Sequence, residues 1–168
     1  VEVAHLLIKG ELPTLAQRHT YAEMLNRHSL LHVDMRNFFR DYPQEAHPMS
    51  ILSAMVASLS AFYPELEDAD PEENVDLTVS RLLSKMRTIA AFSYRQMNGL
   101  DFVDPSYKFS YCENFLNMLF HTPVNAYIPD PLHVKALNIL LILHADHEQN
   151  CSTSAVRLVA SSEANLYA

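Results

Sequence analysis

The segment richest in polar and reactive side chains runs from His144 to Ser154, with the sequence HADHEQNCSTS. It directly follows an apolar stretch, Ala136 to Leu143. Buried polar groups must find partners, so such a segment is costly unless it faces water or a ligand. One interpretation is a surface loop with no chemical role. Another is a pocket for an anion or carboxylate, where a histidine supplies a proton or hydrogen bond and amides of the next helix, beyond Ser152, supply positive potential.

A metal site is the third interpretation of this segment. His144 and His147 have a usable spacing, with Asp146 and Glu148 beside them. The zinc pattern H-E-x-x-H fails, however, because its second histidine would fall on Cys151. We therefore expect no metal.

The composition is typical of one globular, helical unit. The chain has 168 residues, of which 49% are hydrophobic and 19% charged, and this length corresponds to about one domain. Twelve basic against 20 acidic residues give a net charge of −8, which argues against nucleic-acid and anionic membrane surfaces as partners. The two glycines, Gly10 and Gly99, exclude both the G-x-G-x-x-G loop and the Walker loop, and their scarcity disfavours a β-rich fold.

The cysteines and the apolar runs indicate a cytoplasmic protein. Cys112 and Cys151 form no C-x-x-C pair and no disulfide framework, as expected for reduced thiols. No apolar run approaches the roughly 18 residues of a membrane span. The first residues carry no secretory signal. They also lack an initiator Met, so we expect that the chain was cut from a longer one.

Helix signals, separated by prolines, continue along the whole chain. A short helix from Glu2 is predicted to end at Gly10, and a long one to open at the capping box of Thr14 and Gln17 and to end at Pro43. We predict an all-α fold, a single helical segment over residues 1–168. The other helices are expected to begin at Pro48, at Pro71 behind the cap Asp70, at Tyr111 behind the Ser110–Glu113 box, at Pro131 behind Asp130, and near Ser154.

Several blocks of this sequence, in family order over essentially its whole length, resemble citrate synthase, most closely the bacterial type II enzymes. The resemblance implies an almost wholly helical large domain. It also implies a reaction of the tricarboxylic acid cycle that joins acetyl-CoA to oxaloacetate, with water, to give citrate and CoA. The 2-methylcitrate synthases share the fold and are the nearest alternative. The blocks are His47-Pro48-Met49, Arg81 to Met86, Asn114 to Phe120, His144 to Arg157 and Ser161 to Asn165.

The resemblance assigns roles to two histidines. His147 matches the family histidine that hydrogen-bonds oxaloacetate, and His144 matches a neighbour with a mainly supporting role. A partly charged imidazole suits a dicarboxylate. The family's general-acid histidine, its second substrate histidine and its aspartate base come later than residue 168. We therefore expect a piece of the large domain, truncated at both ends, without a catalytic residue and inactive alone.

A regulatory site is also implied, since type II enzymes are inhibited by NADH at a site remote from the chemistry. The matching residues here are Arg27, His28, Tyr63, Arg81 and Lys85. Three cations, a histidine and a tyrosine suit a pyrophosphate and an adenine. Arg81 and Lys85 lie four residues apart on one helix face, and the alternative for them is a solvated face. The chain departs from its best-known relatives at Leu30 (for Met), Arg87 (for Pro), Val124 (for a reactive Cys) and Ala160 (for Gly).

The implied partners are oxaloacetate, acetyl-CoA as co-substrate, and further copies of the chain in dimers or hexamers, with no other cofactor. Apolar stripes over residues 49–62 and 137–143 are expected to remain exposed and to drive self-association. The alternative to an enzyme segment is a helical scaffold or interaction fragment without activity.

Overall fold

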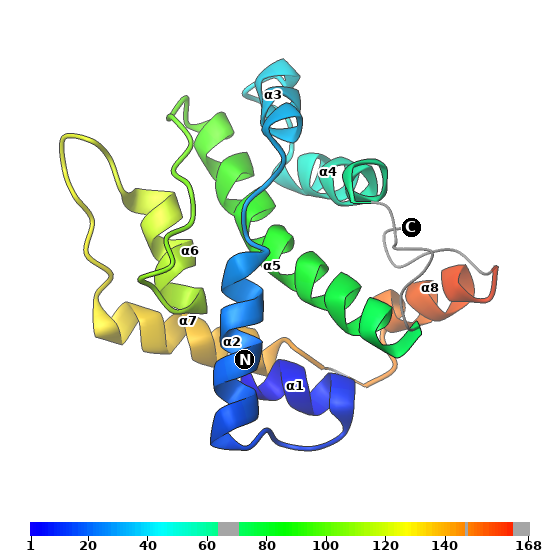
Figure 1. Ribbon diagram of the computed structural model, residues 1–168. Coiled ribbons are helices and arrows are strands. Elements are labelled where there is room, and N and C mark those ends of the chain that lie inside the picture. The colour runs from blue at the N-terminus through cyan, green and yellow to red at the C-terminus, as the bar shows by residue number, and fades with distance from the viewer. Residues whose placement is uncertain (64–70, 147, 163–168) are drawn as a thin grey trace.

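The computed structural model describes residues 1–63, 71–146 and 148–162, and its regular elements over those residues are all helices (Figure 1). This confirms the predicted all-α class. None of the described helices is long and apolar enough to cross a membrane. The helices are α1 (Glu2–Lys9), α2 (Leu15–Arg27), α3 (Val33–Asp41), α4 (Pro48–Phe62), α5 (Pro71–Met97), α6 (Tyr111–Phe120), α7 (Pro131–Leu143) and α8 (Cys151–Ala160).

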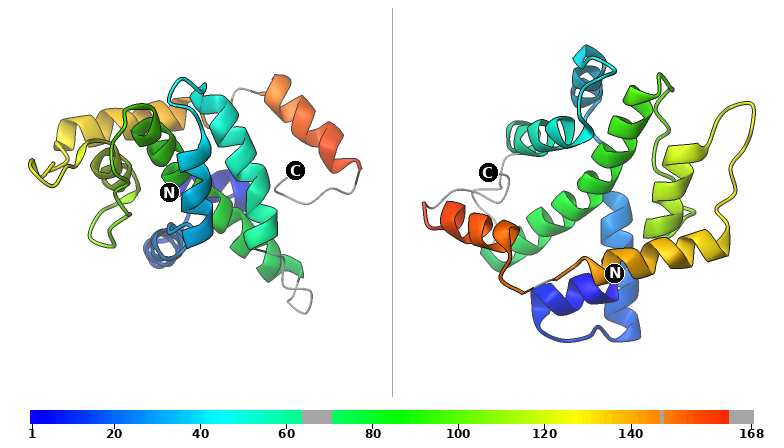
Figure 2. Two further views of the ribbon diagram at one scale, coloured as in Figure 1. Left: turned by 90° about the horizontal axis from the view of Figure 1, so that it is seen from above. Right: turned by 180° about the vertical axis from the view of Figure 1, so that it is seen from behind.

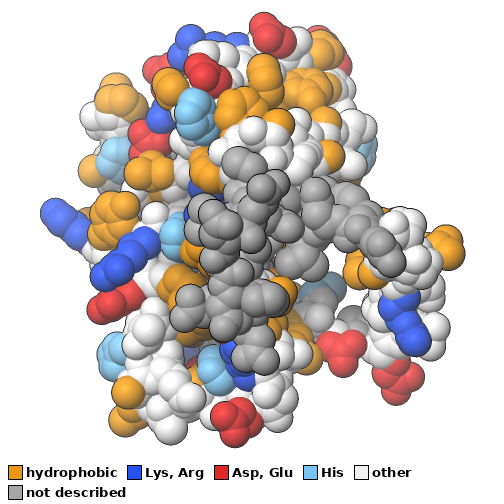
Figure 3. Space-filling view, turned by 45° about the vertical axis from the view of Figure 1, so that its right-hand side comes forward, with side chains coloured by type: hydrophobic (Ala, Val, Ile, Leu, Met, Phe, Trp, Pro, Cys, Tyr) orange, Lys and Arg blue, Asp and Glu red, His pale blue; other side chains and the backbone are white. Residues whose placement is uncertain are grey.

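The long helix α5 organises the rest of the chain (Figures 1 and 2). It contacts α2, α3 and α4, and on the side away from α4 it contacts α6, which in turn contacts α7. In the space-filling view, acidic, basic and hydrophobic side chains are interspersed over the visible described surface (Figure 3).

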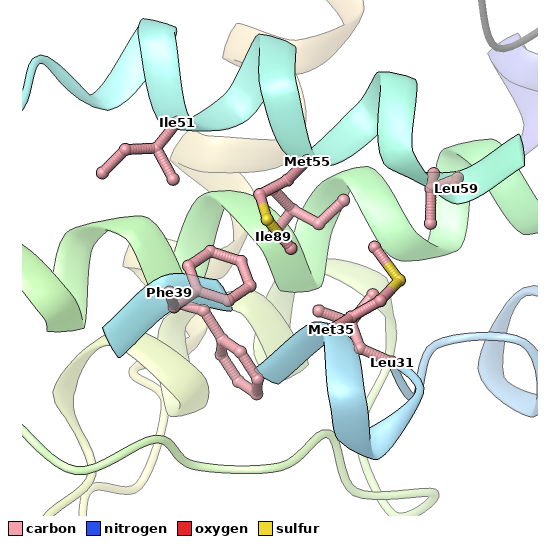
Figure 4. Close-up of a cluster of buried hydrophobic side chains, with 8 residues drawn as sticks. Leu31, Met35, Phe39, Ile51, Met55, Leu59 and Ile89 are labelled. Carbon is pink, nitrogen blue, oxygen red and sulfur yellow. The ribbon is translucent and has the colours of Figure 1, made fainter. Parts of the chain in front are cut away.

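The main core lies where α3 and α4 pack on α5 (Figure 4). Apolar residues of α4 at intervals of four, namely Ile51, Met55 and Leu59, are almost completely buried. This spacing forms one helical stripe, which packs against Ile89 and Phe92 of α5. The prediction that residues 49–62 carry an uncovered stripe is therefore wrong except at Met49, which is 59% exposed, because α5 and α3 cover the rest.

Most predicted helix ends are confirmed, since local hydrogen bonds fix them. The Thr14–Gln17 capping box is present at α2 and the Ser110–Glu113 box at α6. Asp130 accepts the Leu132 N–H at 2.7 Å and caps α7. After α1 and α5, Gly10 and Gly99 take φ values of 79° and 62°, a left-handed conformation that glycine adopts without strain. The predicted cap Asp70 lies outside the described residues.

The single helix predicted from Thr14 to Pro43 is wrong, because residues 28–32 form a linker between α2 and α3. His28 ends α2, and the ring of His32 accepts the Asp34 N–H at the start of α3. Side chains of α5 replace the lost helical hydrogen bonds. Lys85 donates to the carbonyls of His28 and Leu30, and Thr88 donates to the carbonyl of Ser29.

Arg95 joins the far end of α5 to α6. Its Nη1 donates to the carbonyls of Met118, Leu119 and His121 at 3.0–3.1 Å, and its Nε donates to the carbonyl of Asp101. The last carbonyls of a helix have no partner within it, so this buried guanidinium caps α6 and fixes it on α5.

Candidate functional site

The turn between α7 and α8 carries the predicted oxaloacetate residues. His144 ends α7, with φ −101° and ψ 0°, and its Nδ1 lies 2.7 Å from the Leu140 carbonyl oxygen. A carbonyl only accepts, so Nδ1 carries the proton and the ring is oriented along its own helix. His147 lies outside the described residues. No group of three or more metal-ligating side chains occurs in the part of the chain that the structure describes.

Local hydrogen bonds shape the remainder of this turn. The Glu148 N–H donates to Asp146 Oδ1 at 3.1 Å, and Glu148 has a φ of 61°, in the left-handed region that is costly for a side chain. Asn150 accepts the Thr153 N–H at 2.9 Å and caps α8. α8 thus begins at Cys151, earlier than the predicted start near Ser154. The amides of Thr153 and Ser154 donate to Asn150, so any positive potential at this helix end reaches a ligand through the α8 dipole and not through direct hydrogen bonds from these two amides.

The described residues of the turn, 144–146 and 148–150, are all exposed. None of the described residues of this turn is buried by the rest of the described chain. Exposure fits a surface loop and a one-sided binding surface equally well, so burial alone does not decide between the two interpretations.

A second candidate site surrounds Lys85, at the α2–α3 linker. Lys85 is 3% exposed. Its Nζ donates to the carbonyl oxygens of His28 at 3.0 Å and Leu30 at 2.6 Å, and it lies 4.0 Å from the centre of the Tyr63 ring. The ammonium thus lies in a cage of two carbonyls from the α2–α3 linker and one aromatic face from the C-terminal end of α4.

The electrostatics of this second site are positive. Burial and the neighbouring Arg81 lower the pKa of Lys85 from 10.5 to about 8. Burial, and then the charges of Arg81, Lys85 and Arg27, lower the pKa of His28. Burial disfavours a charge of either sign, whereas the part of the His28 shift that comes from Arg81, Lys85 and Arg27 reports positive potential, which favours an anion.

Among the five residues matched to the regulatory site, Lys85 contacts the His28 carbonyl and the Tyr63 ring, and the charge of Arg81 acts on His28. Arg27 is exposed on the last turn of α2, 4.0 Å from the Glu23 carboxylate, and it influences the group by charge alone. The alternative of a solvated helix face is wrong for Lys85, which is buried. Sequence reasoning missed Thr88, whose hydroxyl holds the Ser29 carbonyl at 2.7 Å. Its place three residues after Lys85 was the available signal, because that spacing puts both on one face of α5.

Comparison with known proteins identifies relatives over the whole chain. The family model described as "Citrate synthase, C-terminal domain" matches residues 1–168. Citrate synthase 1 of Mycobacterium tuberculosis is 47% identical over 167 residues, which cover 99% of this chain and 39% of that protein. The chain thus spans about two fifths of the length of this relative.

Solved structures with the same fold are also citrate synthases. The enzyme of Pyrobaculum aerophilum is 33% identical, with a TM-score of 0.85, and the match covers 99% of this chain and 42% of that one. The enzyme of Thermoplasma acidophilum, solved as a ternary complex with carboxymethyl coenzyme A and oxaloacetate, is 25% identical. Its TM-score is 0.88, and the match covers 99% of this chain and 42% of that one.

Proposed function

This chain belongs to the citrate synthase family, and we propose that the complete protein joins acetyl-CoA to oxaloacetate, with water, to form citrate and CoA. The ternary complex of the Thermoplasma acidophilum relative supports this choice of substrates. Within this chain the supporting observation is the α7–α8 turn, where a histidine with a fixed ring precedes the N-terminus of a helix.

In this proposal oxaloacetate binds at the α7–α8 turn. His147 donates a hydrogen bond to an oxygen of the dianion, and a partly protonated imidazole strengthens that bond. His144 supports the turn through its 2.7 Å contact with the Leu140 carbonyl. The positive end of the α8 dipole adds favourable potential for a carboxylate. The catalytic acid and base come from outside these residues.

The test is a pair of Michaelis curves, one per substrate, for variants of the complete protein. His147→Ala should weaken apparent oxaloacetate affinity about ten- to a hundred-fold, since a hydrogen bond to a charged group contributes roughly 1.5–3 kcal/mol. The acetyl-CoA curve should move much less, and His144→Ala should have the smaller effect on oxaloacetate. His133→Ala, an exposed histidine of α7, is the matched control. An unchanged oxaloacetate curve for His147→Ala would leave the surface-loop interpretation in place.

We also propose that the Lys85 site binds NADH as an inhibitor. The support is the excess of positive charge around His28, since guanidinium groups such as Arg81 pair well with phosphates. Lys85 already donates to two backbone carbonyls. It therefore contributes its charge and holds the linker, while Arg81, Arg27 and His28 contact the pyrophosphate and Tyr63 the adenine.

This second proposal is tested by NADH inhibition curves. Arg81→Ala should raise the half-inhibitory NADH concentration about ten-fold, which corresponds to one charge-assisted contact with phosphate. Arg40→Ala removes an exposed arginine elsewhere and should leave the curve unchanged. If the NADH inhibition curve of Arg81→Ala coincides with that of Arg40→Ala, the residues around Lys85 have a structural role only.

We infer further that the apolar side of α7 packs against a second copy of the protein. Ile139, Leu140, Leu141, Ile142 and Leu143 are between 43% and 60% exposed, as the sequence predicted for residues 137–143. A contiguous apolar surface of this kind is typical of an interface. Light scattering over a wide concentration range should give a dimer or a larger assembly, and a monomer throughout would contradict the inference.

A further inference from the structure

Arg87 is a buried cation whose counter-charge is missing from the described residues. It lies on α5 where α6 packs, and it is 3% exposed. Its Nη1 donates to the Tyr111 carbonyl at 3.1 Å, and its guanidinium lies 4.4 Å from the centre of the Tyr111 ring. The ion pairs found among the described residues do not include it.

One edge of the Arg87 guanidinium is unpartnered. Nε and Nη2 have no hydrogen-bond partner in the described part of the chain, and both are shielded from solvent. These two nitrogens share one edge of the planar group, the edge that pairs side-on with a carboxylate through two parallel N–H···O bonds. A buried charge with unpaired donors is strongly unfavourable, so this edge calls for an acceptor.

The neighbours of Arg87 do not provide a negative charge. Tyr111 and Cys112 are the groups whose ionisation would favour its charged form. Burial raises the pKa of both, so both are neutral at pH 7. The Tyr111 hydroxyl is itself a donor, to the Leu83 carbonyl at 2.8 Å. The described neighbours therefore supply neither a counter-charge nor an acceptor for this edge of Arg87.

We propose that the unpartnered edge of Arg87 binds a carboxylate side-on. The shielded position favours a singly charged, planar, weakly hydrated group over sulfate or phosphate, which are costly to dehydrate. The carboxylate is either a short organic acid from solution or a carboxyl side chain from elsewhere in the complete protein. Tyr111, whose ring lies against the guanidinium, and Cys112 also line a groove of about 810 Å³ between α1, α2, α5, α6 and α7, so a carboxylate in this groove is separated from Arg87 by these side chains alone.

The test compares thermal melting in sodium formate and in sodium fluoride, at equal sodium concentrations. For a site that takes a free carboxylate, formate at about 100 times its Kd should raise Tm by about 5–10 °C. Arg87→Met should abolish the formate response. Arg40→Met removes an exposed arginine and the same charge, and it should keep the response.

The result differs if the carboxylate that binds Arg87 is a side chain of the complete protein. In that case formate has no effect on Tm, and Arg87→Met lowers Tm because the carboxylate is left buried and unpaired. That loss should shrink below about pH 4, where carboxyl groups protonate. The proposal is overturned if formate has no effect and Arg87→Met melts at the same or a higher temperature. It is also overturned if formate has no effect and the loss caused by Arg87→Met is independent of pH, since the arginine then contributes packing alone.

Discussion

Replacing Lys85 by Met tests how the α2–α3 linker is held. The change removes hydrogen bonds of 3.0 and 2.6 Å from an ammonium to the carbonyls of His28 and Leu30, and a contact with the Tyr63 ring. Hydrogen bonds to charged groups contribute roughly 1.5–3 kcal/mol each, and the cation–π contact adds about 1 kcal/mol. Their gross contribution is therefore about 4–7 kcal/mol.

The burial of the ammonium offsets part of this contribution. The pKa of Lys85 falls from 10.5 to about 8, and each unit corresponds to about 1.4 kcal/mol, so its charged form is disfavoured by about 3–4 kcal/mol in the folded state. Lys85→Met should therefore lose up to about 4 kcal/mol at pH 7, which lowers the Tm of a chain of this size. Met has a similar length and keeps most of the apolar packing.

The sign of the pH dependence makes the test specific. Between pH 8 and pH 10.5 the unfolded chain keeps the lysine proton that the folded chain has released, so folding stability should rise with pH over this range. Tyr21 and Tyr111 act in the opposite direction at alkaline pH, because burial raises the pKa of each, but they are common to both proteins. The difference in unfolding free energy between the unmodified protein and Lys85→Met should therefore widen from pH 7.5 to pH 10. A constant or narrowing difference, by urea unfolding, would refute the reasoning.

Three further substitutions test the packing on which the two candidate sites depend. Arg95→Met should destabilise the protein by about 3 kcal/mol or more in urea unfolding. The carbonyls of Met118, Leu119 and His121, which accept hydrogen bonds from Arg95, would then be left without this donor. Asn150→Ala removes the α8 cap and should lower stability by about 1 kcal/mol, with faster amide exchange at Thr153 as the local readout. Met55→Ala should cost about 2–5 kcal/mol as a buried truncation, whereas the exposed Met49→Ala should be nearly neutral.

Helix ends were predictable where neighbouring residues alone determine them. Thr14 with Gln17 and Ser110 with Glu113 form their boxes within one turn, so the sequence carries the whole interaction. α8 shows the limit of this reasoning. Asn150 and Ser154 are both good caps, and the choice of Asn150 depends on its hydrogen bond with Thr153 and on the turn that precedes it.

The α2–α3 linker could not be predicted in this way. Residues 28–32 contain neither glycine nor proline, so nothing local interrupts the helical pattern. The donors that hold the linker come from Lys85 and Thr88, which are 57 and 59 positions away from His28 and Ser29. Contact across the fold, rather than propensity, decides this break. The burial of Lys85 could not be predicted for the same reason. Its partners are distant backbone carbonyls, which every residue has, so no residue type in the sequence marks them.

Four buried polar side chains of α5 bind backbone carbonyls of neighbouring segments. Lys85 and Thr88 bind carbonyls of the α2–α3 linker, Arg87 binds the Tyr111 carbonyl, and Arg95 binds the carbonyls that end α6. The contacts of Lys85, Thr88 and Arg95 replace hydrogen bonds that a linker or a helix C-terminus cannot make for itself, whereas the Tyr111 carbonyl lies at the start of α6. Every residue offers a carbonyl, so the segments that receive these donors can change sequence without losing the contact, whereas the donors on α5 cannot be replaced by apolar residues without leaving carbonyls unsatisfied. Both candidate sites depend on this arrangement: the linker beside His28 directly, and the α7–α8 turn through α6, on which α7 packs.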